Sequence, residues 1–114
     1  MRTRYVLLLL LCASASAGAN DFPTRARVAF VLTCMQESKA PLQESMYKCS
    51  CAIDAIADKV HYDEWVNLST IANGITIAGE GGGVMRDIKD ARKLIASYRK
   101  MQEDAKKQCF IRTE

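Results

Sequence analysis

The cysteines are the first residues of this 114-residue sequence whose type and spacing could do chemistry. Cys49 and Cys51 form a Cys-Ser-Cys motif, and Cys34 and Cys109 lie on either side of it. As free thiolates near a methionine, the motif could hold Cu(I), which selects sulfur ligands, or form a redox-active pair. The fifth cysteine, Cys12, lies in a predicted signal peptide, whose removal leaves four. Exported chains with an even number of cysteines more often bridge them. We therefore predict two disulfides worth roughly 2–4 kcal/mol each, which join Cys49 and Cys51 to Cys34 and Cys109 in either order.

Carboxylates form the second group. Asp54 and Asp58 are four residues apart, so they share one face of a helix, and further acidic residues follow. Hard cations such as Ca²⁺, and by the same logic the trivalent lanthanide ions, need six or more oxygen ligands. By composition alone the pattern favours a solvated acidic surface, with Asp63 as a helix N-cap. The candidate ligands are Asp54, Asp58, Asp63, Glu64, Glu80, Asp87 and Asp90.

Other catalytic and binding motifs are missing. The sequence has a single histidine, His61, and no Gly-x-Ser-x-Gly, so a serine triad has no support. The Cys-Ser-Cys spacing does not fit a haem attachment motif. The glycine-rich stretch 79–83 lacks the ending of a P-loop, so we expect a flexible turn from which Glu80 could reach a metal. We therefore predict a protein that is not an enzyme.

The elements that must position these residues are predicted to be helices throughout. Apolar residues recur every three or four positions over about 23–37, from 41 or 42 to 60, over 63–77 and over 84–109. On the second helix Cys49 lies within the apolar stripe, whereas Cys51 is turned about 200° away. We predict an all-α fold, a small disulfide-stapled bundle of about four helices. That stripe contains Leu42, Met46, Cys49, Ile53, Ile56 and Val60, and the first helix carries Val28, Val31, Leu32 and Met35.

The first nineteen residues have the pattern of a secretory signal peptide. Arg2 and Arg4 precede a short apolar run, and overlapping Ala-x-Ala sites end at Ala19. Residues 20–114 would then form a single helical domain of 95 residues in the periplasm, with 14 basic and 13 acidic side chains. This balance and the lack of a basic stripe argue against a nucleic-acid partner, and the apolar run is too short to span a membrane.

The stretch YKCSCAIDAIA at 47–57, followed by YDEWV at 62–66, carries a family resemblance. It resembles small helical periplasmic proteins associated with quinoprotein (PQQ-dependent) alcohol dehydrogenases in methylotrophs, and in particular the lanthanide-trafficking LanD-type proteins. The resemblance covers about 28–110. It implies a non-enzymatic periplasmic protein that binds or delivers lanthanide ions, with a possible metal-dependent homodimer. Of the candidate ligands, the resemblance carries over only Asp54 and Asp63, and the other five are candidates from geometry alone.

Two functions follow as hypotheses. The first is lanthanide binding through a carboxylate cluster, with a quinoprotein dehydrogenase or another periplasmic metal carrier as partner. The second is a metal-free structural or interaction module that partners a secreted dehydrogenase. The second predicts an exposed apolar patch on the folded protein.

Overall fold

A computed structural model describes residues 20–112, and within them the chain is helical with no strand. This confirms the all-α prediction, although the described residues form five helices rather than about four. The predicted signal peptide at 1–19 lies outside the described residues. Within 20–112, no helix is both long and apolar enough to cross a membrane. The helices are α2 (Thr24–Glu37), α3 (Leu42–Ala57), α4 (Tyr62–Gly74), α5 (Glu80–Arg86) and α6 (Ala91–Gln108).

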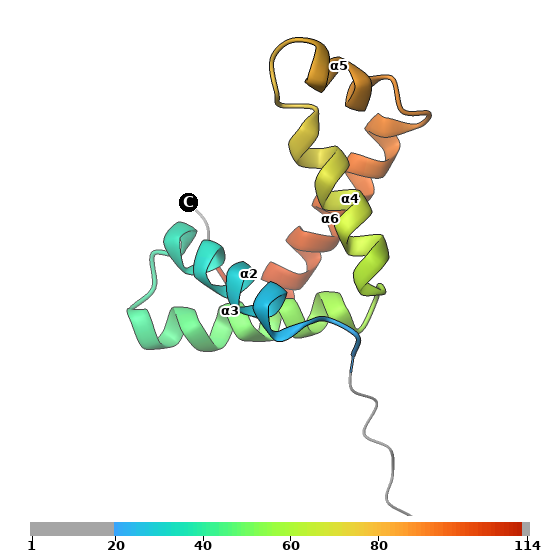
Figure 1. Cartoon of the computed structure of the whole chain (residues 1–114). Helices are drawn as coiled ribbons and strands as arrows, with labels where there is room; N and C mark the ends of the chain where they lie inside the picture. The colour runs from blue at the N-terminus through green and yellow to red at the C-terminus, as the bar shows by residue number, and fades with distance from the viewer. Residues whose placement is uncertain (1–19, 113–114) are drawn as a thin grey trace, which may run out of the picture.

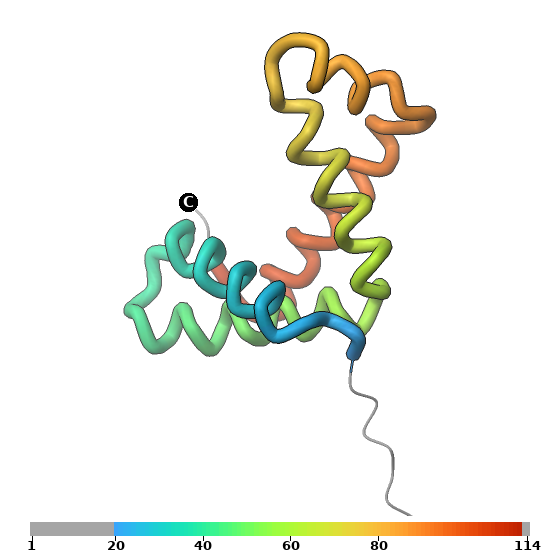
Figure 2. Tube along the Cα trace, in the orientation of Figure 1, coloured from blue at the N-terminus to red at the C-terminus, as the bar shows by residue number. Residues whose placement is uncertain are grey.

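The helices form two antiparallel pairs that meet at a steep angle (Figure 1). α2 packs on α3, and α4 packs on α6. The end of α6 also packs against α3, so the second pair stands on the first, while the short α5 covers the far end of α4 and α6. The tube in Figure 2 shows that residues 20–23 run past the corner where α3 leads into α4.

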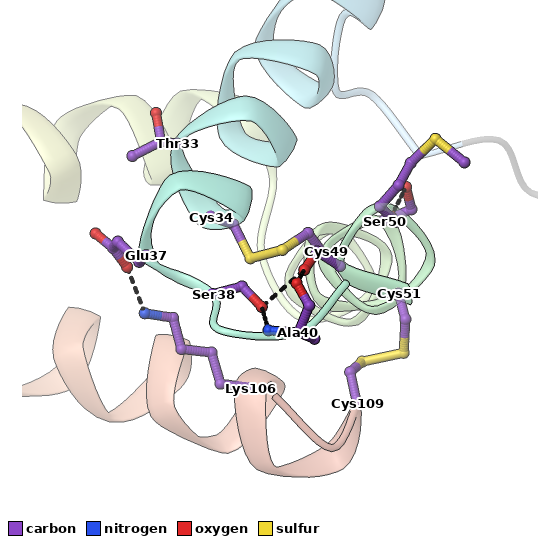
Figure 3. Close-up of a disulfide and its surroundings, with 12 residues drawn as sticks. Thr33, Cys34, Glu37, Ser38, Ala40, Cys49, Ser50, Cys51, Lys106 and Cys109 are labelled. Carbon is purple, nitrogen blue, oxygen red and sulfur yellow. Dashed lines mark hydrogen bonds and ion pairs between the residues drawn. A yellow bond between two sulfur atoms is a disulfide. The ribbon is translucent and has the colours of Figure 1, made fainter. Parts of the chain in front are cut away.

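Two disulfides hold α3 between its neighbours. Cys34 of α2 is bonded to Cys49, and Cys109 at the end of α6 is bonded to Cys51. Figure 3 shows the two bonds leaving α3 on different sides. The prediction of two disulfides is confirmed, and the structure supplies the pairing that the sequence left open.

The core is small and lies around the middle of α3. Ile53, Ile56 and Ala52 are almost completely buried there, and Phe22 from the N-terminal segment and Ala105 from α6 pack against them. The α2–α3 turn is closed by the buried Ser45. Its hydroxyl lies 2.9 Å from both the Ser38 hydroxyl and the Ala40 carbonyl oxygen.

The predicted inward stripe of α3 is wrong at its N-terminal end. Leu42 is 78% exposed and Met46 is 42% exposed, whereas Cys49, Ile53 and Ile56 are buried. α2 ends at Glu37, so no helix covers the first turn of α3. Leu42 therefore has the spacing of a core residue without an element to pack against.

The single helix predicted over 84–109 is also wrong. The chain forms α5, leaves the helical conformation after Arg86 and resumes it at Ala91, with Asp90 in the left-handed region at φ 60°. Of the stretch 79–83, predicted as a flexible turn, residues 80–83 form the start of α5 and Gly79 precedes it. A Cβ atom on Gly82 would lie 1.7 Å from the carbonyl oxygen of Ile77, so this close approach requires glycine.

The start of α4 differs from the prediction that Asp63 caps it. The helix begins at Tyr62 with His61 as the cap residue, so the cap lies two residues earlier than predicted. The backbone N–H of Tyr62 donates to the carboxylate of Asp21, at 3.0 and 3.1 Å from its two oxygens. The carboxylate of Asp21, forty-one residues away in the sequence, thus accepts the hydrogen bond that a local N-cap side chain would normally accept. Asp63 lies exposed in the first turn of α4.

Removing the two disulfides should have unequal effects on stability. The Cys34–Cys49 bond closes a separation of 15 residues and the Cys51–Cys109 bond one of 58. By loop entropy, the paired Cys→Ala variants should lose about 3 and about 4 kcal/mol of unfolding free energy, respectively. Urea denaturation of both oxidised variants measures this. An equal or larger loss for the Cys34–Cys49 variant would contradict loop entropy as the main cause.

Candidate functional site

The seven acidic residues proposed as metal ligands are exposed and lie on four different parts of the fold. Within residues 20–112, no three His, Cys, Asp or Glu side chains are placed to hold one metal ion. Glu80, Asp87 and Asp90 flank α5 at one end of the molecule, whereas Asp54 and Asp58 lie on or beside α3 at the other (Figure 1). α4 separates these two groups, and its 13 residues span about 20 Å.

Asp54 already has a cationic partner. Its carboxylate forms an ion pair with the guanidinium of Arg27, which joins α3 to α2. The two side chains are 53% and 38% exposed, so the pair contributes little to stability. A metal ion at Asp54 would have to displace the guanidinium group.

Asp58 lies in a small pocket at the α3–α4 corner, together with Asp21, Lys59 and His61. The pocket has a volume of about 230 Å³. The Nδ1 atom of His61 lies 3.5 Å from a carboxylate oxygen of Asp21, which also accepts the Tyr62 N–H. Asp63 and Glu64 follow on the first turn of α4. Asp21 was not singled out from the sequence, because no local pattern relates it to a helix forty-one residues later.

The four cysteines have a structural role. All four sulfur atoms of Cys34, Cys49, Cys51 and Cys109 are in disulfides, so none of them is a thiolate that could bind Cu(I). Cys34, Cys49 and Cys109 are also almost completely buried.

An aromatic cluster lies where α2, α4 and α6 converge. Trp65 is at its centre, with ring centroids 5.0 Å from Tyr98, 6.0 Å from Phe30 and 6.1 Å from Phe22. The rings of Phe30, Trp65 and Tyr98 line one side of a cleft of about 530 Å³ between the three helices. An ion pair between Lys106 and Glu37, 3.0 Å apart, lies at the edge of the cleft. Burial raises the pKa of Tyr98 above its ordinary value of 10.0, so its phenol stays neutral at physiological pH.

Among the described residues, an apolar surface lies exposed along α2. From Val28 to Gln36 the chain has nine residues without a charge, yet Val28 is 51% exposed and Leu32 is 57% exposed. Together with the half-exposed Met46 of α3 they border a groove of about 450 Å³. We call this the α2 surface. Its groove is lined by Thr24, Arg27, Val28, Val31, Leu32, Met35, Met46, Ser50 and Ile53.

The sequence indicates the apolar face of α2 through its periodicity, but not that this face is exposed. The spacing of Val28, Val31, Leu32 and Met35 indicates a helix with an apolar face, which a core would normally cover. In the fold α3 covers only part of that face. Comparisons with protein-family models, with curated proteins and with solved structures find no match to this chain.

Lanthanide binding stays a prediction that a titration can test. Tb³⁺ added to the oxidised protein, with excess Ca²⁺ present and excitation through Trp65, should give saturable emission if a site exists near Asp63 and Glu64. In that case Asp63→Asn should weaken Tb³⁺ binding. Asp87→Asn, beyond the opposite end of α4, should not. Absence of bound Tb³⁺ in a direct metal assay would contradict the lanthanide hypothesis. Sedimentation with and without Tb³⁺ tests the metal-dependent homodimer.

Proposed function

We propose that this chain is a non-enzymatic, extracytoplasmic interaction module that binds a helix of a partner protein on the α2 surface. The exposure of Val28 and Leu32 within a nine-residue uncharged stretch is the observation that carries the proposal. Contiguous apolar patches on a folded protein commonly mark sites of association. Fully burying one such side chain is worth about 1.5–3 kcal/mol, so a few of them can support a specific interface.

The shape of the α2 surface supports a helical partner. Val28 and Leu32 are one turn apart on the ridge of α2, and the groove beside them runs between α2 and α3. An amphipathic helix laid into such a groove places its own residues at three- and four-residue spacing against it. Because the Cys34–Cys49 bond fixes α2 against α3, the groove is formed before binding and less ordering entropy is lost.

The compartment and the partner are part of the proposal. Two disulfides fit an oxidising compartment outside the cytoplasm. The signal-peptide pattern at 1–19 supports export, and the family resemblance supports the periplasm. The same resemblance makes a quinoprotein alcohol dehydrogenase the first partner to test.

Leu32→Asp should abolish partner binding while leaving the fold intact. The side chain is 57% exposed, so the substitution should cost less than about 1 kcal/mol of unfolding free energy. In a pull-down with a purified quinoprotein alcohol dehydrogenase in EDTA, the wild type should be retained and the variant lost. Thr70→Asp, which adds the same charge to an exposed position on α4, is the matched control.

Two results would contradict the proposal. Equal retention of Leu32→Asp and the wild type would exclude the α2 surface as the binding site. Failure of the wild type to bind in EDTA, followed by binding when Tb³⁺ is added, would favour the metal-dependent hypothesis instead.

A further inference from the structure

The C-terminal end of α6 carries an aromatic residue where glycine is preferred. The N–H of Ile111 donates to the carbonyl of Lys106 at 2.9 Å, and the N–H of Phe110 to the carbonyl of Lys107 at 3.2 Å. This pair of bonds is the Schellman motif that ends many helices, and it places Phe110 at the position that is usually glycine. Its φ of 57° lies in the left-handed region, which side chains with a Cβ adopt at a cost.

The phenyl ring of Phe110 makes few packing contacts that could offset the cost of this backbone conformation. It is 78% exposed, whereas the next residue, Ile111, packs against the core and supplies the apolar contact that accompanies this motif. The Cys51–Cys109 disulfide immediately before it fixes the position of the backbone. An exposed phenylalanine held in an unfavourable backbone conformation suits a role in contacts made outside the chain.

Phe110 borders a groove with a strong excess of positive charge. The groove has a volume of about 680 Å³ and is formed by the α2–α3 turn, the first half of α3 and the residues around the end of α6. Among the described residues, four cationic side chains line it, together with one carboxylate, that of Glu44, which is paired with Lys48. Part of this region is shown in Figure 3. We call it the basic groove, and its cationic residues are Lys39, Lys48, Lys107 and Arg112.

We propose that the basic groove and Phe110 bind an acidic segment of a partner protein that carries an apolar side chain. The cations supply charge complementarity, and Phe110 supplies an apolar anchor at the edge of the groove. A small anion would not use the exposed ring. A bilayer is flat, so it would not reach cations that line a concave surface.

This site is distinct from the α2 surface. Lys48 lines the basic groove and Met46 lines the apolar groove. Residues two apart on a helix are turned about 200° from each other, so the two grooves lie on different sides of α3. The proposal therefore goes beyond the proposed function, and the Leu32→Asp variant should bind an acidic segment as the wild type does.

Fluorescence anisotropy with a labelled ten-residue peptide of alternating Glu and Leu tests the proposal at low salt. Phe110→Gly should weaken binding about tenfold, yet its Tm should be equal to or higher than that of the wild type, because glycine relieves the left-handed conformation. Lys39→Glu should also weaken binding about tenfold. Lys93→Glu, the same charge reversal at an exposed position near the start of α6, should leave it unchanged.

The possible outcomes separate the proposal from its rivals. Unchanged affinity of Phe110→Gly for the peptide would overturn the proposal. An equal loss of affinity in Lys39→Glu and Lys93→Glu would also overturn it, because it would mean a general charge effect. Binding to phosphatidylserine vesicles without binding to the peptide would assign the basic groove to a membrane surface and overturn it as well.

Discussion

The clamp that two disulfides place on α3 is the constraint on which the rest of the structure depends. Cys49 and Cys51 point to different sides of one helix, so the Cys-Ser-Cys motif joins α2 on one side and the end of α6 on the other. The buried apolar side chains around Ile53 and Ile56 are few, and a core of this size gives modest stability by itself. Covalent bonds therefore replace part of the packing that a larger domain would use.

The clamp also explains why two grooves with different chemistry lie on either side of α3. It holds α2 in place although α3 covers only part of its apolar face, which leaves Val28 and Leu32 exposed. On the other side it fixes the end of α6 beside the α2–α3 turn, so that Phe110 and cations from separate segments line one concave surface. A rigid module with an apolar and a basic groove is suited to holding two parts of a partner, or two partners, at a set distance.

The sequence predicted the local structure better than the arrangement of the helices. Helical periodicity located α2 and most of α3, and the 200° offset of Cys51 correctly placed the two disulfides on different sides of α3. Periodicity shows which residues share a face, but not whether another element covers it, so Leu42 and Leu32 were expected to behave like core residues. The capping of α4 by Asp21 depends on a contact with a segment forty-one residues away, which no local pattern records. The break before α6 places Asp90 in the left-handed region, which apolar periodicity alone does not indicate. The acidic cluster required residues at both ends of the molecule to meet, and α4 keeps those ends apart.

We propose that the disulfide clamp presents the apolar side chains of α2 to a partner instead of to the core. Hydroxyl-radical footprinting of the oxidised protein, alone and mixed with a quinoprotein alcohol dehydrogenase, tests it most directly. We expect Leu32 and Met46 to react readily in the free protein and to be protected in the mixture. The buried Ile95 should react slowly in either case. Slow reaction of Leu32 in the free monomer would contradict this role of the clamp, because α2 would then already be covered by the chain itself.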